Sequence, residues 1–143
     1  MPVIKAYTDA SFDEQRKVAG IGIVIRDGLK ERVYSLWTKA RTVNEAELYA
    51  IHMGSILTGG QGIIYTDSQT AILYIKGCIK DKPRTREQYI NHMHCEFWAQ
   101  QIRRRGIHVE KIKAHQKNYQ THSIGNRMAD LLAMAGRGKY YEK

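Results

Sequence analysis

The tripeptide Tyr-Thr-Asp occurs twice in the sequence, each time at the end of a short apolar run. The first copy, "YTDAS", places Asp9 at the end of residues 3–9, and the second, "YTDSQ", places Asp67 at the end of residues 62–67. One interpretation is that these residues form turns, because Asp and Ser are common where a strand ends and cap the helix that follows. The other is that Asp9 and Asp67 face each other across the ends of neighbouring strands, where carboxylates can bind a metal ion.

Two further acids lie beside apolar residues on expected helices. Glu47 precedes Ala50 by one turn on an apolar face, so we expect it to point along the edge of the core. Asp130 has Ala133 one turn further on. Glu45 is expected to be the solvated acid of its helix. Taken singly, each acid also fits an ordinary residue at the edge of a core, with hydrogen-bond partners for its carboxylate.

Four carboxylates at one end of a sheet would repel one another, and each would raise the pKa of the others. A divalent cation relieves that repulsion, and Mg²⁺ prefers oxygen ligands from a few carboxylates together with a phosphate group. Two such ions about 4 Å apart can activate water and stabilise the leaving oxygen of a phosphodiester displacement. Together, the four acids therefore favour metal-dependent phosphodiester chemistry.

The charge of the chain points to a polyanionic partner. Lys and Arg number 23 against 14 acids among 143 residues, which gives a formal net charge of +9. Nucleic acid is the first candidate and an anionic membrane surface the second, while a merely basic soluble protein is the alternative. No charged-then-apolar leader and no long apolar span is seen, so we expect no membrane contact and a cytoplasmic location. Cys78 and Cys95 fit reduced thiols rather than a disulfide or zinc site.

The pattern of the chain predicts one α/β domain over residues 1–143. Residues 3–9, 18–26 and 31–39 are rich in β-formers, and the last two are expected to form a hairpin that turns at Asp27-Gly28. The following elements are then expected in order: a helix capped by Thr42 with Glu45, a strand at 62–67, a helix from Ser68 to Gly77, a helix from Thr85 to Gly106, a strand at 107–115, a polar loop at 116–125, and a helix from Asn126 to about Ala135. Residues 136–143 are expected to be a frayed basic tail.

This order predicts one sheet with an antiparallel side and a parallel side, covered by helices. The strands that end in Asp9 and Asp67 are the natural parallel neighbours. Their carboxyl ends would flank a change in connection direction, where open α/β sheets place their sites.

Five segments in this order, "YTDAS", "NEAEL", "YTDSQ", "KAH" and "GNRMADLLA", make the whole chain resemble a type 1 ribonuclease H. The resemblance implies a ribonuclease H-like fold with a five-stranded mixed sheet: the first three strands form an antiparallel meander, and the first, fourth and fifth run parallel. It also implies a monomeric endoribonuclease that hydrolyses the RNA strand of RNA–DNA hybrids with two Mg²⁺ ions, for which Mn²⁺ can substitute, leaving 5′-phosphate and 3′-hydroxyl ends.

The resemblance also implies roles for individual residues. The metal-binding carboxylates would be Asp9, Glu47, Asp67 and Asp130. Contacts with the hybrid, suited to the wide minor groove where 2′-hydroxyl groups distinguish RNA, would come from Ser11, Asn44, Gln69 and Asn126. The mobile catalytic histidine of the family would be His115, which directly follows the fifth strand, with His122 in the same long loop as the alternative.

The chain departs from the family in the region after the second helix. Many bacterial members carry a basic, tryptophan-rich protrusion there, whereas residues 76–88 are basic and contain no tryptophan. This region is expected either to contact phosphates of the DNA strand or to be a solvated loop. A junction resolvase or DNA nuclease of the same fold and a non-catalytic nucleic-acid-binding module are the competing functions. The biological role, the preferred metal and membership of a larger protein stay open.

Overall fold

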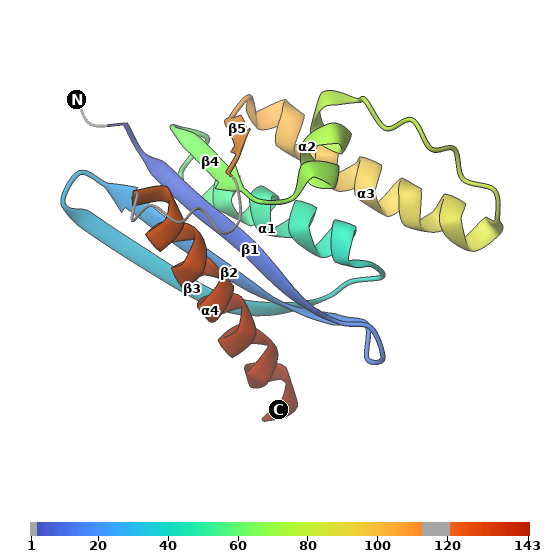
Figure 1. Cartoon of the computed structure of the whole chain (residues 1–143), viewed down its shortest axis with the longest axis horizontal. Coiled ribbons are helices and arrows are strands. Elements are labelled where there is room, and N and C mark those ends of the chain that lie inside the picture. The colour runs from blue at the N-terminus through green and yellow to red at the C-terminus, as the bar shows by residue number, and fades with distance from the viewer. Residues whose placement is uncertain (1–2, 113–120) are drawn as a thin grey trace.

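The computed structural model describes residues 3–112 and 121–143. Its five strands form one sheet in the order β3-β2-β1-β4-β5 (Figure 1). The strands are β1 (Lys5–Asp13), β2 (Val18–Asp27), β3 (Lys30–Lys39), β4 (Ile63–Thr66) and β5 (His108–Lys111). The helices are α1 (Val43–Leu57), α2 (Gln69–Lys76), α3 (Arg86–Arg105) and α4 (Thr121–Tyr141).

The sheet has the predicted mixed topology. Strands β1, β2 and β3 pair antiparallel, while β1 pairs parallel with β4 and β4 pairs parallel with β5. The predicted five-stranded mixed sheet is therefore confirmed. Residues 113–115, the end of the expected fifth strand, lie outside the described residues.

Two boundaries in the meander differ from the prediction. Strand β1 continues past Asp9 to Asp13, because the residues after Asp9 pair with β2, as far as Asp13 opposite Val18. Asp9 is therefore inside a strand rather than at its end. The hairpin turn lies at Gly28 and Leu29, one residue later than predicted, since Asp27 still pairs with Lys30. Gly28 has a φ of 64°, which glycine adopts without strain.

Side chains cap the first three helices as the sequence predicts. Thr42 accepts a hydrogen bond from the backbone N–H of Glu45, Ser68 from that of Ala71, and Thr85 from that of Gln88. Each cap satisfies one of the N–H groups that the first turn of a helix leaves without a partner. Gly77 and Gly106 end α2 and α3 in the left-handed conformation, as expected for C-terminal glycines.

Helices cover both faces of the sheet (Figure 1). The larger core lies between the sheet and helices α1, α2 and α3, and includes Ala6 and Ile23. The smaller core lies under α4 and includes Tyr7, Val24 and Ala129. Neighbouring residues of β1 and β2 thus alternate between the two cores, as side chains of a strand do.

Helix α4 is much longer than the predicted helix from Asn126 to Ala135. It begins at Thr121, inside the expected loop, and continues to Tyr141 through the expected frayed tail. Glycines let it approach the sheet closely: a Cβ atom on Gly22 would lie 1.9 Å from the carbonyl oxygen of Ala129, and one on Gly136 would lie 2.0 Å from that of Leu36. Packing therefore extends the helix through glycines that suggest a helix end in the sequence.

In the described part of the chain, no helix combines the length and the apolar character that a membrane span requires.

Candidate metal centre and active site

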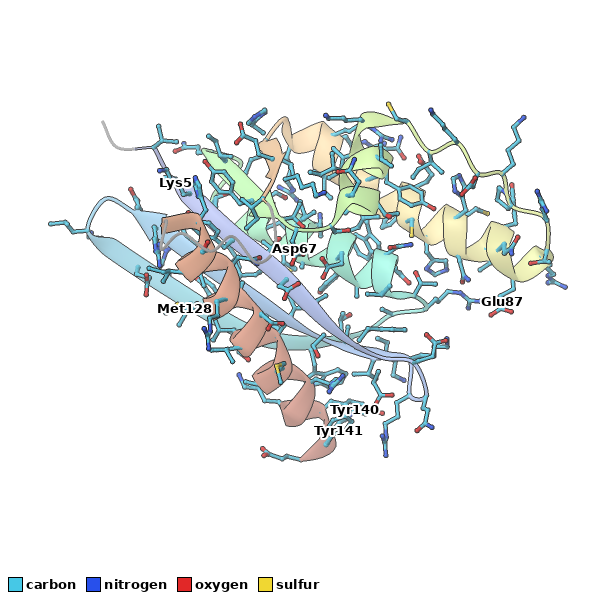
Figure 2. The ribbon with its side chains drawn as sticks, in the orientation of Figure 1. Lys5, Asp67, Glu87, Met128, Tyr140 and Tyr141 are labelled. Atoms are coloured by element: carbon cyan, nitrogen blue, oxygen red, sulfur yellow. The ribbon has the colours of Figure 1, made fainter. Side chains whose placement is uncertain are left out.

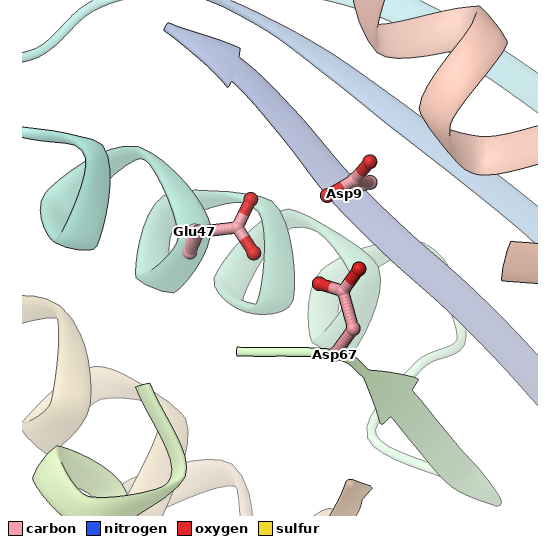
Figure 3. A group of neighbouring side chains, drawn as sticks. All are labelled: Asp9, Glu47 and Asp67. Carbon is pink, nitrogen blue, oxygen red and sulfur yellow. The ribbon is translucent and has the colours of Figure 1, made fainter. Parts of the chain in front are cut away.

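Three acidic side chains, from β1, from α1 and from the residue that follows β4, converge beside β1. One carboxylate oxygen each from Asp9, Glu47 and Asp67 lies within 4.8 Å of the other two, and Figure 3 shows the three groups pointing toward one another. Asp9 and Glu47 are buried, with 8% and 7% of their surfaces exposed. Such a group of oxygen donors has the composition of a magnesium or manganese site.

The sheet register explains why the two aspartates meet. Tyr7 of β1 is paired with Tyr65 of β4 in the parallel register, and the same offset brings Asp9 level with Asp67. Strand β4 ends at Thr66, so β1 runs on without a parallel neighbour from that point. Beyond the end of β4, the side chain of Glu47 on α1 points toward Asp9 (Figure 3).

Asp9 and Glu47 have raised pKa values. Burial raises the pKa of Asp9 to about 7, helped by the nearby charge of Asp67 and a hydrogen bond with Asp130. Burial also raises the pKa of Glu47 well above its ordinary value, with the charges of Asp9 and Asp67 adding to the effect. The group therefore carries a repulsion that a cation would relieve.

The residues fit a divalent metal ion. Glu47 Oε1 is buried and has no hydrogen-bond partner among the described residues, although buried polar atoms normally have one. All the donors in the group are carboxylate oxygens, which Mg²⁺ and Mn²⁺ accept as ligands. A buried oxygen without a protein partner, inside a group of mutually repelling acids, fits the donor set of a cation site.

Asp130 approaches the three acids from the other face of the sheet. It lies on α4, is exposed, and shares a hydrogen bond with Asp9 that contributes to the raised pKa of Asp9. It does not belong to the group of oxygens within 4.8 Å. The fourth expected carboxylate is thus beside the cluster but outside its tightest part.

The sequence matches the family model of RNase H over residues 2–137. The chain belongs to the RNase H family. The resemblance to type 1 ribonucleases H is therefore confirmed, and membership places the chain among the hydrolases of the ribonuclease H class. A comparison with curated proteins found no match.

Solved RNase H structures share the fold. RNase H1 from the halophilic archaeon Halobacterium salinarum NRC-1 superposes with a TM-score of 0.64 at 16% identity, covering 95% of this chain and 98% of that one. LC11-RNase H1, isolated from compost by a metagenomic approach, gives 0.63 at 22% identity, covering 99% of both chains. The same LC11 enzyme in complex with an RNA/DNA hybrid gives 0.59 at 20% identity, covering 96% of this chain and 99% of that one.

Each residue expected to contact the substrate lies two to four residues along the chain from one of the four expected metal-binding carboxylates. Ser11 follows Asp9 by two residues on β1, and Gln69 follows Asp67 by two residues as the exposed first residue of α2. Residues two apart on a strand share a face, as do residues three or four apart on a helix. The helical pairs are Asn44 with Glu47 on α1 and Asn126 with Asp130 on α4.

The prediction that Asn126 caps the last helix is wrong, because α4 begins five residues earlier, at Thr121. It is partly buried within the helix, and its Oδ1 atom is buried without a hydrogen-bond partner among the described residues. Asn126 precedes Asp130 by four residues, so the two lie on the same face of α4.

The prediction that Glu45 is the solvated acid of α1 is wrong. Glu45 is only 6% exposed and accepts hydrogen bonds from the backbone N–H of Arg41 and from Trp98 Nε1. Its second oxygen also lies 3.2 Å from His94 Nδ1. Glu45 therefore ties α1 to α3 and lies outside the carboxylate cluster.

The structure describes only one of the two candidate histidines. His115 lies outside the described residues. His122 lies in the first turn of α4, where its ring packs 4.3 Å from that of Tyr65 and its Nδ1 is 2.8 Å from the hydroxyl oxygen of Tyr7. Burial raises the pKa of Tyr7, so the phenol keeps its proton, and the tautomer of His122 sets which of the two groups donates the hydrogen bond. Sequence reasoning missed this anchoring role of His122.

Replacing His122 by alanine should mainly cost stability. The change removes a hydrogen bond and a ring contact that hold the start of α4, so we expect a loss of about 1–3 kcal/mol in the free energy of unfolding. The turnover rate of the folded enzyme should stay within about twofold, whereas His115→Ala should lower it by about 100-fold, typical of a lost acid–base group. Urea unfolding and initial rates of both variants separate the two effects. An unchanged stability together with a slow His122→Ala enzyme would make His122 the catalytic histidine.

Proposed function

We propose that this chain is an endoribonuclease that hydrolyses the RNA strand of RNA–DNA hybrids and leaves 5′-phosphate and 3′-hydroxyl ends. The observation that carries the proposal is the buried group of Asp9, Glu47 and Asp67, whose oxygens converge within 4.8 Å. Acids buried together without a counter-charge are costly to a fold, and binding of a cation accounts for their placement. The RNase H family supplies the reaction class for such a site.

Asp9, Glu47, Asp67 and Asp130 would hold two divalent ions, Mg²⁺ or in its place Mn²⁺. When bound, the ions would supply the charge that activates a water molecule and stabilises the leaving oxygen of an in-line displacement. The elements that carry the carboxylates fix their positions: Asp9 stands on β1, Asp67 directly follows the neighbouring strand β4, and Glu47 is held by α1. His115 would accept or return a proton at the reacting phosphate.

The substrate class follows from charge and from the polar residues beside the carboxylates. A net charge of +9 suits a polyanion, and the related LC11-RNase H1 has been seen in complex with an RNA/DNA hybrid. Ser11, Asn44 and Gln69 offer hydroxyl and amide groups within a few residues of the carboxylates, and Asn126 does so beside Asp130. Groups of this kind are able to bond the 2′-hydroxyl groups and base edges of a wide minor groove.

We also propose that the chain forms a single RNase H domain over residues 1–143 and works as a monomer in the cytoplasm. The presence of free thiols at Cys78, which is exposed, and Cys95, which is buried, supports a reducing compartment. The basic connection between α2 and α3 carries exposed Lys80, Lys82 and Arg84 (Figure 1), which are available to phosphates of the DNA strand.

The reaction is tested by a time course on one RNA–DNA hybrid with Mg²⁺, with Mn²⁺ and with a chelator. We expect cleavage within the RNA strand in both metals and none in chelator. Fragments produced at internal sites should accept a 5′ label only after phosphatase treatment, which identifies a 5′-phosphate. Cutting that persists in chelator, or fragments that carry 3′-phosphate ends, would contradict the proposed chemistry.

The raised pKa of Asp9 predicts how stability depends on pH. Because the folded state holds a proton up to about pH 7 that the unfolded state releases near pH 4, the stability of the metal-free protein should fall as pH rises between these values. Asp13, whose pKa is lowered to about 2, acts below this window. Binding of Mn²⁺ must displace the proton at pH 6 but not at pH 8, so the metal should raise the melting temperature more at pH 8.

Melting curves from pH 5 to pH 8, with chelator and with Mn²⁺, measure this linkage. In an Asp9→Asn variant the pH dependence should be flatter and the effect of metal smaller. A metal-induced rise in melting temperature that is larger at pH 6 than at pH 8 would contradict the linkage.

A further inference from the structure

A groove lined by cations and aromatic rings lies at the end of β2 opposite the β2–β3 turn. There the β1–β2 turn lies near the C-terminal end of α4, where Figure 2 labels Tyr140 and Tyr141. A cavity of about 440 Å³ at this place is lined by Arg16, Tyr140, Tyr141 and Lys143.

A second cavity continues from the first. It measures about 480 Å³ and shares Arg16 and Tyr140 with the first. Its lining also includes the cations Lys17, Lys39 and Arg41 and the acids Glu45 and Glu87. We call the two cavities together the end groove. Arg41 lies just before α1, so the end groove runs toward the helix that carries Glu47.

Aromatic rings hold cations in the end groove. The Lys143 ammonium lies 4.9 Å from the centroid of the Trp37 ring and 5.6 Å from that of Tyr140, and the two rings meet edge to face. Arg16 lies 5.1 Å from the centroid of Tyr141. A ring attracts a cation without cancelling its charge, whereas a carboxylate partner neutralises it. The charge of Lys143 is thus positioned and still available to an anion.

Three of the acids near the end groove have partners of their own: Asp13, Glu14 and Glu45, which bonds Trp98 and the backbone of Arg41. Asp13 accepts hydrogen bonds from Arg16 and from the Tyr141 hydroxyl, and Glu14 pairs with Lys17. Within the described part of the chain, Lys39, Arg41 and Lys143 form no ion pair with an acid; Arg41 instead bonds the neutral amide of Asn91. Among the described residues, Lys39 and Lys143 therefore have no ion-pair partner in the groove, although the exposed Glu87 also lines it; Arg16 is partly balanced by Asp13.

The end groove lies within reach of a strand held at the carboxylates. Asp13, at the turn end of β1, is four residues beyond Asp9 on the same strand, which corresponds to about 13 Å at about 3.3 Å per residue. One strand of a duplex places a phosphate about every 3.4 Å along its axis. A strand with one phosphate at Asp9 and running along β1 would thus place another near the groove after about four nucleotides.

We propose that the end groove binds the sugar–phosphate backbone of the hybrid, about four nucleotides from the phosphate that is cleaved. Lys39 and Lys143 bind phosphates, while Trp37 and Tyr140 hold Lys143 in place. The inference rests on the proposed function for its substrate. It adds a second contact that lengthens the footprint of the enzyme in one direction only.

The test compares a Lys39→Gln/Lys143→Gln variant with the wild-type enzyme. The substrate is an end-labelled hybrid of about 20 base pairs, and initial rates are measured at each internal phosphodiester. The variant should cut interior sites about fivefold more slowly, because two phosphate contacts are lost. It should match the wild type at sites within about four nucleotides of one end of the hybrid, where no backbone reaches the groove. Equal slowing at every site, or no slowing, would overturn the proposal.

A binding measurement decides the same question without cleavage. With chelator present, anisotropy of a labelled hybrid gives the dependence of affinity on salt, whose slope should fall by about 2 when two phosphate contacts are removed. An unchanged slope in the variant would overturn the proposal for the end groove, whether or not the wild-type enzyme cleaves the hybrid. Absence of cleavage by the wild-type enzyme would count against the proposed function instead.

The matched control is Lys30→Gln/Arg32→Gln. Lys30 and Arg32 are exposed at the other end of β3 from Lys39, so the control also removes two positive charges but far from the end groove. It should keep the wild-type rates at every site and the wild-type salt slope. Melting curves of both double variants confirm that each is folded.

Discussion

Replacing Asp9 and Asp67 together by asparagine should abolish metal-dependent cleavage while making the metal-free protein more stable. We expect the turnover rate to fall by at least about 1000-fold, which corresponds to about 4 kcal/mol of transition-state stabilisation. Stability should rise because burial and mutual repulsion raise the pKa of Asp9 to about 7, so the folded state bears a cost near neutral pH that asparagine lacks. Initial rates on a hybrid and melting curves in chelator measure the two effects.

Asp27→Asn is the matched control for charge. Asp27 is an exposed acid at the end of β2, on the side of β1 away from β4, and its replacement should change neither rate nor stability by a measurable amount. The double variant should also lose the rise in melting temperature that Mn²⁺ produces in the wild-type protein. Full activity in the double variant would exclude Asp9 and Asp67 as metal ligands.

Gly22→Ala should destabilise the protein and slow it far more than its size suggests. A Cβ atom at this position would lie 1.9 Å from the carbonyl oxygen of Ala129 and 2.6 Å from the backbone nitrogen of Ala133, so α4 must move away from the sheet. Overpacking against backbone of this kind costs about 3 kcal/mol. Asp130 follows Ala129 directly, so we expect the rate of the folded variant to fall by at least about tenfold through its displacement from Asp9.

Gly138→Ala on α4 is the control for the loss of a glycine. A Cβ atom there has nothing within 4 Å, and alanine is the better helix former by up to about 1 kcal/mol. That variant should be as stable as the wild type or more so, with an unchanged rate. Urea unfolding of both variants gives the comparison, and equal stabilities would show that close approach at Gly22 does not hold α4.

Local chemistry made much of the fold predictable from the sequence. Thr42, Ser68 and Thr85 each cap a helix through the N–H three residues on, and both the residue type and the spacing are visible in the sequence. The parallel pairing of β1 and β4 was predictable because the hydrophobic periodicity changes from that of a strand to that of a helix between them.

Helix α4 was not predictable because its length is set by distant residues. Gly136 suggests a helix end in sequence, yet it marks the place where the helix approaches the backbone of Leu36. Tyr140 extends the helix further by packing edge to face on Trp37 of β3. Contacts of this kind join residues about a hundred positions apart, and no local pattern records them.

The site shows the same division. Glu45 and Glu47 stand two residues apart in the first half of α1, and both are buried. Glu47 meets Asp9, while Glu45 meets Trp98 and His94 of α3. The apolar neighbours of Glu47 predict its place at the edge of the core. The partners of Glu45 lie on α3, and the packing of α3 against α1 cannot be read from a local sequence pattern.

The most direct test of the central claim is a gel assay on one labelled RNA oligomer, presented alone, paired to RNA and paired to DNA, with Mg²⁺ and with chelator. The buried carboxylates in an RNase H fold predict metal-dependent cutting of the DNA-paired RNA alone. Binding of the hybrid by folded protein without any cutting in metal would contradict the account and would favour a nucleic-acid-binding module.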